Sequence, residues 1–491
     1  DSFAEEIARL ALTLADIPNP NGWNIQHSDI YENDILEKAA QKATILFCNP
    51  PFENFSPEEQ KKYGNSIKTG NKAAEVMAKT LPNLPPNSVF GIILPQGFLH
   101  KKNLANLRRY ILDDYELRYI CNLPEKVFEK SRHLSTVLLG RKNKVRKNIT
   151  YLCINRSNLE RFKNTYQTSE ILNVSKDELL GSKNCSFRII QLKDVWDYKT
   201  GLILEDICDI GKGLEYKGKE RNLPKNAITF SNEPFKNGVE GFAYYDRKIT
   251  LTELPQIVYL NLSDEVIRRP QWGVDSGKPQ VLLNYSRVSS EPWRLKAWID
   301  EKGHPVTSNF LVVRSKDLNE WSLSCIWALL NSPYTNAFAY CQNMERSNIT
   351  GVMRVMPVPK INRSQKDIID SLVLKYFSVS KSITTGSIPR TIKQEAKSIL
   401  LEIDAEILRL YNLPPRLEKM VLDFFESFQR RGVDFKFDRY YPEGFDSYIP
   451  LHMYISKEFQ DSSVENVKKW IESNRSPEVI EAFKIAAKIK K

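Results

Sequence analysis

Two continuous apolar runs, at residues 43–48 and 89–94, constrain the fold of this 491-residue chain more than any other feature. Short apolar runs of this kind are typical of strands buried on both faces, as parallel sheets require. Helical patterns at residues 71–81 and 101–113 alternate with these runs, and apolar residues recur at helical spacing over residues 7–14. The alternation of strand and helix predicts βαβ units, and therefore an α/β fold for this region.

The tetrapeptide Asn49-Pro50-Pro51-Phe52 directly follows the first apolar run. To methylate an exocyclic NH2 group, an enzyme accepts hydrogen bonds from both of its protons, which draws the nitrogen out of conjugation with the ring. The Asn49 side-chain oxygen and the Pro50 carbonyl are the two candidate acceptors. The prolines restrict the backbone, and Phe52 offers a face for stacking. The tetrapeptide predicts a binding site for a planar amine. The alternative is a turn that ends the strand, with Phe52 in the core.

This tetrapeptide is also the catalytic motif of a known family, and the chain resembles the gamma-class N6-adenine DNA methyltransferases of restriction-modification and phage-defence systems, of the type I and type IIG kinds. The flanking segments that carry the resemblance are residues 1–12 (the acidic end of the second strand and the next helix), 24–30 (the third strand), 89–99 (the fifth strand and its exit) and 123–139 (the late strands that close the target-base pocket). The resemblance implies a Rossmann-like, S-adenosylmethionine-dependent methyltransferase core that is N-terminally incomplete in this chain.

The resemblance also assigns site residues. Asp29, with its neighbour Ile30, stands where the family's acid accepts a hydrogen bond from the adenine amine of S-adenosylmethionine, and Asp1 lies beside the position of the ribose-binding acid. The family's glycine-rich cofactor loop is expected before Asp1, whereas Gly211-Lys212-Gly213 lies far downstream and is expected to be an ordinary loop. His133, near the pocket-closing strands, is the candidate to stack on the extruded base; a surface loop His is the alternative.

Residues 186–365 interleave aromatic rings with cations. Arg and Asn side chains pair bidentately with guanine and adenine edges, whereas Lys and Ser mostly hold phosphates. For any single residue, an ordinary solvated surface is the alternative. Taken together and placed after the methyltransferase motifs, the region resembles a DNA target-recognition domain. The candidate DNA-binding residues are Arg247, Lys248, Arg268, Arg269, Arg287 and Arg346.

The expected organisation is an α/β catalytic core, an α/β recognition domain and a helical C-terminal region, since apolar residues recur every 3.6 positions in residues 368–377 and 392–411. The expected segments are a catalytic core at 1–160, a linker at 161–185, a target-recognition domain at 186–365, a helical region that closes it at 366–440, and a helical basic tail at 441–491. Strand-like alternation resumes directly after the linker, at 187–192.

Composition adds outer bounds. Lysine and arginine number 71 against 60 aspartate and glutamate residues, and the net charge of +11 suits a polyanionic partner without requiring one. The seven cysteines include no CxxC pair, so neither a metal site nor a disulfide framework is expected, and they are typical of reduced thiols in a cytoplasmic protein. No apolar run approaches the length of a membrane span, and no secretory signal is present.

The expected reaction is transfer of a methyl group from S-adenosylmethionine to N6 of a flipped-out adenine in double-stranded DNA, as part of a restriction-modification or phage-defence system with its other subunits. Flipping costs about a few kcal/mol of stacking and pairing. Two alternatives stay open: an RNA or protein-glutamine N-methyltransferase, against which the long region at 186–440 argues, and a catalytically inactive DNA-recognition module.

Overall fold

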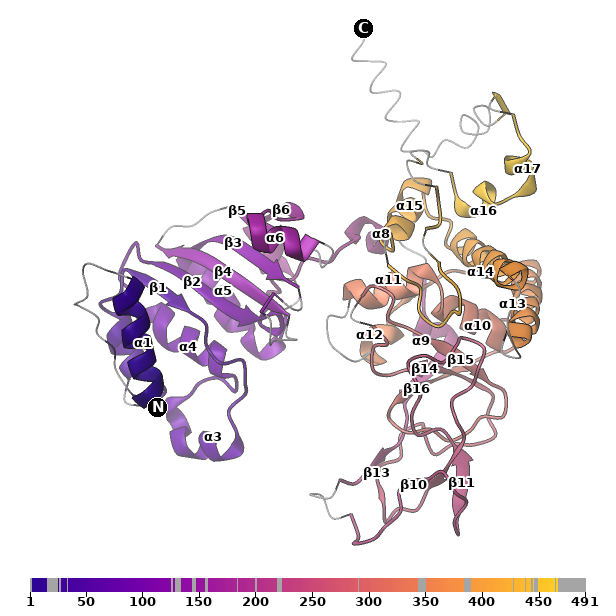
Figure 1. The fold of residues 1–491 in the computed structure, drawn as a ribbon, viewed down its shortest axis with the longest axis horizontal. Coiled ribbons are helices and arrows are strands. Elements are labelled where there is room, and N and C mark those ends of the chain that lie inside the picture. Colours follow the sequence, from indigo (N-terminus) through magenta and orange to yellow (C-terminus); the bar gives the residue numbers. More distant parts are fainter. Residues whose placement is uncertain are drawn as a thin grey trace. The chain divides into compact units, whose positions relative to one another are not determined.

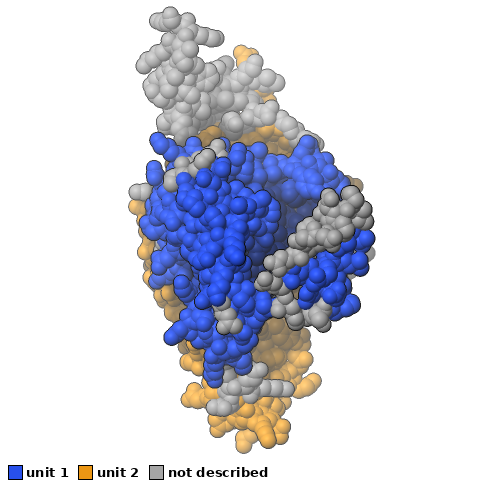
Figure 2. Space-filling model, turned by 90° about the vertical axis from the view of Figure 1, so that its left-hand side faces the viewer, with its two compact units in different colours: residues 1–189 blue, residues 190–491 orange. Residues whose placement is uncertain are grey.

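The computed structural model forms two compact units, Asp1–Ile189 and Ile190–Lys491, which are described separately below (Figure 2). The structure describes residues 2–466 except 16–24, 26–27, 33, 125–126, 129–133, 144–146, 155–157, 183, 199–200, 219–222, 290, 343–349, 384–389, 427, 438, 443–444, 446–448 and 464. Three residues to which the sequence assigns a role, Asp1, His133 and Arg346, lie outside the described residues.

Unit 1 is built around a six-stranded mixed sheet with the order β1-β2-β4-β3-β5-β6 (Figure 1). The strands are β1 (Ile45–Cys48), β2 (Val89–Pro95), β3 (Tyr115–Leu123), β4 (Ser135–Lys142), β5 (Asn148–Cys153) and β6 (Glu170–Ser175). The two apolar runs pair in parallel, as predicted, with Ile45 opposite Val89. β3 and β5 are also parallel, while β4 lies antiparallel between β2 and β3. An α/β fold is therefore confirmed.

The helices of unit 1 are α1 (Ser2–Ala15), α2 (Ile35–Ala40), α3 (Pro57–Tyr63), α4 (Lys72–Thr80), α5 (Ala105–Asp114), α6 (Leu159–Thr165) and α7 (Lys176–Gly181). The predicted helices near 71–81 and 101–113 are confirmed as α4 and α5, which contribute to one core with β2 (Figure 1). The prediction that the first run is buried on both faces is wrong. β1 is an edge strand, and Ile45 and Phe47 on its second face are 58% and 75% exposed.

The expected third strand and the expected linker differ from the structure. Of residues 24–30, those described are not in a strand, because the Asp29 side chain accepts a hydrogen bond from the Tyr31 N–H and starts a turn. Residues 161–185 are not a linker, since β6 pairs with β5 along its whole length. The chain stays packed on unit 1 as far as Phe187, which is fully buried and forms no strand with the residues after it.

Buried Arg108 on α5 explains why the chain beyond β6 stays attached. Its guanidinium donates to the carbonyls of Asn184 and Cys185 at 2.8 Å each, and to the carbonyl of Phe98 at 2.7 Å. Burial lowers the pKa of Arg108 to about 10, but four carbonyls accept hydrogen bonds from its guanidinium. A buried cation that is hydrogen-bonded through all three of its nitrogens is costly to separate from its partners, so this segment belongs to unit 1.

Unit 2 holds a four-stranded antiparallel sheet with the order β15-β14-β16-β8. Its strands are β8 (Cys208–Lys212), β14 (Gln280–Asn284), β15 (Ala297–Asp300) and β16 (Phe310–Ser315). The short helix α10 (Leu323–Leu330) packs against this sheet, and the long helices α13 (Arg363–Ile383) and α14 (Arg390–Tyr411) pack against each other and against α10. Both long helices confirm the predicted helical region, which shares one hydrophobic core with the sheet.

Smaller elements complete unit 2. They are β7 (Leu202–Ile203), α8 (Lys193–Asp197), α9 (Leu204–Ile207), α11 (Pro333–Gln342), α12 (Thr350–Arg354), β17 (Pro357–Val358), α15 (Pro415–Asp423), α16 (Leu451–Tyr454) and α17 (Lys457–Gln460). Two small sheets extend from the four-stranded sheet (Figure 1): β9 (Glu215–Tyr216) with β13 (Ile267–Arg269), and β10 (Phe230–Ser231) with β12 (Val258–Asn261) and β11 (Gly238–Gly241).

The Gly211-Lys212-Gly213 segment is not a free loop, because its first two residues end β8. A Cβ atom on Gly211 would come within 2.0 Å of the Trp272 ring, and one on Gly213 within 2.1 Å of the Thr307 carbonyl oxygen. Both glycines are therefore explained by close packing.

The seven cysteines are free thiols, and four of them are buried. Over the described residues, no helix combines the length and the apolar character that crossing a membrane requires.

Candidate functional site

The tetrapeptide Asn49 to Phe52 lies at the carboxyl edge of the parallel strands, where ligands bind in open α/β sheets. Pro50 is buried and anchors the segment, Asn49 and Pro51 are exposed, and Phe52 is half-buried. Among the contacts between described residues, none occupies the side-chain amide of Asn49. The tetrapeptide thus presents a polar, accessible amide on a fixed backbone, as a grip on an amine requires.

The chain that follows Phe52 is held by Asn71, the N-cap residue of α4. The side-chain Nδ2 of Asn71 lies 3.1 Å from the Phe52 carbonyl, 3.2 Å from the Glu53 carbonyl and 3.2 Å from Asn54 Oδ1. Its Oδ1 accepts a hydrogen bond from the Ala74 N–H at 3.1 Å, which caps the helix. Sequence reasoning missed this residue, although an Asn before a helical pattern is a visible N-cap signal.

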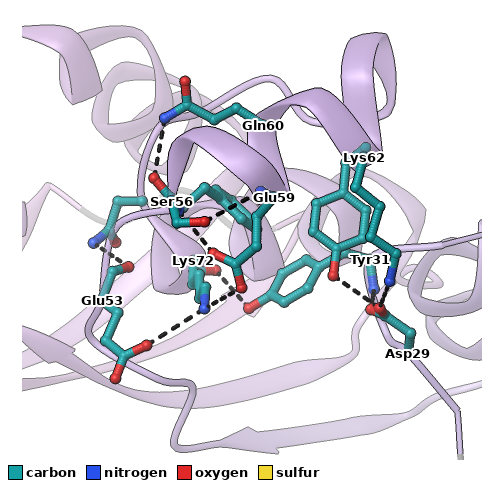
Figure 3. A network of polar contacts seen from close by, with 11 residues as sticks. Asp29, Tyr31, Glu53, Ser56, Glu59, Gln60, Lys62 and Lys72 are labelled. Atoms are coloured by element: carbon teal, nitrogen blue, oxygen red, sulfur yellow. Dashed lines mark hydrogen bonds and ion pairs between the residues drawn. The ribbon is translucent and has the colours of Figure 1, made fainter.

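Ion pairs fix α3 to the start of α4 (Figure 3). Lys72 Nζ lies 2.7 Å from Glu59 Oε1 and 3.4 Å from Glu53 Oε2. The hydrogen bond to Glu59 raises the pKa of Lys72, and the same bond lowers the pKa of Glu59. Ser56 and Glu59 also form a capping box at the start of α3. The whole segment from Glu53 to the start of α4 is therefore tied down beside the tetrapeptide.

Asp29 has three partners, two of which come from α3 (Figure 3). Its Oδ2 accepts hydrogen bonds from Lys62 Nζ and from the Tyr63 hydroxyl at 2.8 Å each, and its Oδ1 accepts one from the Tyr31 N–H at 3.1 Å. Burial alone would raise the pKa of Asp29, but the hydrogen bonds, above all that from Lys62, outweigh burial and hold the pKa below its usual value. Sequence reasoning did not foresee these partners.

The surroundings of Asp29 fit its expected role toward a cofactor amine. A carboxylate oxygen has room for two hydrogen bonds, and Oδ1 accepts one in this structure. The Asp29 side chain is 29% exposed, and Ile30 beside it is exposed at 36%. The rings of Tyr31, Phe55 and Tyr63 form a cluster next to it, with centroids 4.9 to 5.8 Å apart. Tyr31 and Phe55 are buried, so this cluster holds Asp29 in place, and the partly exposed carboxylate is the acceptor that suits an amine.

In unit 2, two candidate DNA-binding residues gather on the β9–β13 ribbon. Arg268 and Arg269 lie on β13, and each has a guanidinium nitrogen within 3.9 Å of Glu215 Oε2 on β9. Lys212 Nζ lies 2.7 Å from Glu215 Oε1 and 4.3 Å from the centroid of the Tyr285 ring. The hydrogen bond from Lys212 is the main cause of the lowered pKa of Glu215. One carboxylate thus faces three cations.

The contact between Lys212 and the Tyr285 ring connects this cluster to two neighbouring loops. The hydroxyl of Tyr245 donates to the Ser286 carbonyl at 2.7 Å, so the loop with Arg247 and Lys248 lies against the loop with Arg287. Arg247 and Lys248 are exposed, and Arg287 is half-buried. Five of the six candidate residues therefore lie either on β13 or on the two loops that Tyr245 joins: Arg247, Lys248, Arg268, Arg269 and Arg287.

A known family model matches most of unit 1. Residues 1–179 match the family model described as N-6 DNA Methylase. No curated protein matches the chain.

Several solved structures are similar. A modification subunit of a putative type I restriction enzyme from Vibrio vulnificus has 16% identity over 36% of this chain and 43% of that chain, with a TM-score of 0.30. The type I restriction-modification methyltransferase subunit from Streptococcus thermophilus has 17% identity over 37% and 44%, with a TM-score of 0.29. The type IIL restriction-modification enzyme MmeI, solved in complex with DNA, has 11% identity over 79% and 57%, with a TM-score of 0.48. This chain spans about half the length of these proteins.

Proposed function

We propose that this chain, whose residues 1–179 are an N-6 DNA methylase domain, methylates N6 of an adenine in double-stranded DNA as one component of a restriction-modification system. The observation that carries the proposal is the position of Asn49 to Phe52: an accessible amide on a proline-fixed backbone at the carboxyl edge of the parallel strands of that domain. The methyl group would come from S-adenosylmethionine when it is bound.

The residues of the tetrapeptide have separate roles in this proposal. The Asn49 side-chain oxygen and the Pro50 carbonyl accept the two hydrogens of the adenine amine, and this localises the nitrogen lone pair for attack. Phe52 stacks on the base after it leaves the duplex. Pro51, with Pro50, limits the conformations of the backbone, so little entropy is lost when the base binds.

Other residues would hold the cofactor and the base. Asp29 accepts a hydrogen bond from the adenine amine of S-adenosylmethionine through Oδ1, next to Ile30. The family resemblance places Asp1 beside the ribose-binding acid of the same cofactor site, and His133 is the candidate to stack on the extruded base. No covalent intermediate with the protein is needed, because the amine itself is the nucleophile.

Unit 2 would hold the DNA. Four of its candidate cations are exposed: Arg247, Lys248, Arg268 and Arg269. Exposed cations neutralise phosphates and release counterions, while Arg side chains also read guanine edges. Arg287 and Arg346 are further candidates from the sequence. This assignment makes unit 2 the target-recognition part of the enzyme.

The test is transfer of tritiated methyl groups from S-adenosylmethionine to duplex DNA by the full-length protein. We expect Asn49→Ala to lower transfer by about 100-fold or more, the scale for losing one positioned polar group in an active site. DNA binding stays within about twofold, because DNA contacts lie mainly in unit 2. The matched control is Asn65→Ala, an exposed Asn of the same unit, which keeps full activity.

Near-normal transfer by Asn49→Ala would contradict the proposed role. Parallel assays with RNA and protein substrates test the other N-methyltransferase reactions, and transfer to one of them rather than to DNA would replace the proposal. Failure of the full-length protein to bind S-adenosylmethionine, with site-specific DNA binding intact, would instead indicate an inactive recognition module.

A further inference from the structure

One side chain links the methylase tetrapeptide to the core of unit 1. Asn71 is only 8% exposed, and its NH2 group lies within hydrogen-bond distance of three oxygens that belong to Phe52, Glu53 and Asn54. Two amide hydrogens serve these three acceptors, so at least one hydrogen is shared. Among the contacts between described residues, the bond to the Phe52 carbonyl is the one that reaches into the tetrapeptide.

The other end of the Asn71 amide is fixed to a rigid element. Its Oδ1 caps α4 through the Ala74 N–H, and Ala73, Ala74 and Met77 of this helix are fully buried in the core of unit 1. An N-cap residue has extended backbone angles, and Asn71 has φ −121° and ψ 128°. The position of its NH2 group is therefore set by the helix and not by the loop that it holds.

Backbone pairing supports the same connection but stops short of Phe52. The Lys72 N–H donates to the Glu53 carbonyl at 3.0 Å, and the Phe55 N–H donates to the Gly70 carbonyl at 3.1 Å. These bonds would keep the segment after the tetrapeptide in place without the Asn71 side chain. What they do not fix is the peptide plane of Phe52 itself.

We propose that Asn71 is a positioning residue for methyl transfer. From the capped end of α4, its NH2 group donates to the Phe52 carbonyl and fixes the orientation of that peptide group. The Phe52 ring and the adjoining proline carbonyls are positioned through it. The inference rests on the proposed function, because it assigns Asn71 to the same reaction. Asn71 contacts neither substrate nor cofactor in this scheme. A displacement of about 1 Å in an active site can cost about 100-fold in rate, so a single such bond has a measurable effect.

The test separates capping from donation. Asn71→Asp and Asn71→Ser both keep a side-chain oxygen that caps α4, since Asp and Ser are as good as Asn at this position. Asp has no NH2 group to donate, and the Ser hydroxyl is too short to reach the Phe52 carbonyl while it caps. Asn71→Ala loses both functions. The matched control is Asn83→Asp at the other end of α4, where Asn83 Nδ2 donates to the Lys79 carbonyl at 2.9 Å.

In the full-length protein we expect Asn71→Asp and Asn71→Ser to lower kcat by about 10- to 100-fold. The KM values for S-adenosylmethionine and DNA stay within about twofold. The melting temperature of Asn71→Ser stays near that of wild type because the cap is retained, whereas Asn71→Asp melts lower, because its second carboxylate oxygen faces the three oxygens to which Asn71 donates. Asn83→Asp keeps the wild-type kcat.

Wild-type kcat in both Asn71→Asp and Asn71→Ser overturns the inference. A loss of kcat that follows the melting temperature across all three Asn71 variants also overturns it, because that pattern means a structural role alone. Absence of transfer by the wild-type protein is a different result. It would remove the proposed function, and with it the reaction that Asn71 is assigned to.

Discussion

The hydroxyl of Tyr63, in the last turn of α3, donates a 2.8 Å hydrogen bond to the carboxylate of Asp29, 34 residues earlier in the chain. Lys62 donates to the same oxygen at 2.8 Å. The helix that follows Asn49 to Phe52 is therefore bound to Asp29, the acid that we propose as a cofactor ligand. α3 therefore connects Asp29 to the segment that follows Asn49 to Phe52.

The first prediction follows from the charge of Asp29. We expect Asp29→Asn to weaken S-adenosylmethionine binding to the full-length protein by about 10-fold, or about 1.4 kcal/mol, because hydrogen bonds to a charged group are stronger than those to a neutral one. Titration calorimetry measures this change, while DNA affinity stays unchanged. Asp34→Asn is the control, since Asp34 is exposed and makes no side-chain capping bond. Wild-type cofactor affinity in Asp29→Asn would exclude this role.

The second prediction concerns Glu215, which compensates the charge of Lys212, Arg268 and Arg269. We expect Glu215→Gln to tighten non-specific duplex DNA binding at low salt and to steepen the salt dependence of log K by about 1, because one more cation becomes available to phosphates. Fluorescence anisotropy over a salt series measures both quantities. Glu320→Gln, at an exposed position elsewhere in unit 2, should change neither. Unchanged or weaker binding by Glu215→Gln would place the DNA on another surface.

The sequence predicted the local elements of unit 1 well, and the reason is physical. Continuous apolar runs identified β1 and β2 and their parallel pairing, and the 3.6-residue period identified α4 and α5. The pattern could not show that β4 lies between β2 and β3, because strand order depends on contacts between distant residues. β6 lies inside the expected linker. Its exposed face carries polar Asn173, so the segment does not have the continuous apolar pattern of a buried strand.

The candidate site shows the same division. Asn49 could be placed at a strand end because its neighbours in the sequence define that strand. Two of the three partners of Asp29 lie 33 and 34 residues away on α3, and no local pattern encodes such pairing. Asn71 is an intermediate case: its cap is a local signal, but its bond to Phe52 spans 19 residues and depends on how the loop folds.

The third prediction concerns the buried ion pair of Arg430 with Asp404 on α14. Both side chains are at most 1% exposed, Tyr440 donates to the same carboxylate at 3.0 Å, and Arg430 also donates to the Asn331 carbonyl at 3.0 Å. We expect Arg430→Met to destabilise unit 2 by about 3–5 kcal/mol, because it leaves a buried carboxyl without its cation. The double variant Arg430→Met with Asp404→Leu should recover much of this loss. Chemical denaturation measures both; equal losses in the two variants would show that packing, and not charge, dominates.

The last prediction is a pH dependence set by Lys296, the residue directly before β15. Its ammonium donates to the Arg247 and Ile249 carbonyls at 2.6 Å each and so holds the loop that carries Arg247 and Lys248. Burial lowers its pKa from 10.5 to about 8, with smaller opposing contributions from Asp246, which raises the pKa, and Arg431, which lowers it further.

The direction in which the free energy of unfolding changes with pH follows from the number of protons that each state binds. Between about pH 8 and 10.5 the folded chain has lost the Lys296 proton while the unfolded chain retains it. The unfolded state therefore binds more protons in this range, and stability gains a contribution that rises with pH, whereas below pH 8 the contribution is flat. We expect the free energy of unfolding of the wild type, measured relative to Lys296→Met, to increase from pH 8 to pH 10. Lys316→Met is the control, since Lys316 also donates to a backbone carbonyl but is exposed. A difference between wild type and Lys296→Met that is constant with pH would mean that Lys296 keeps an ordinary pKa despite its burial.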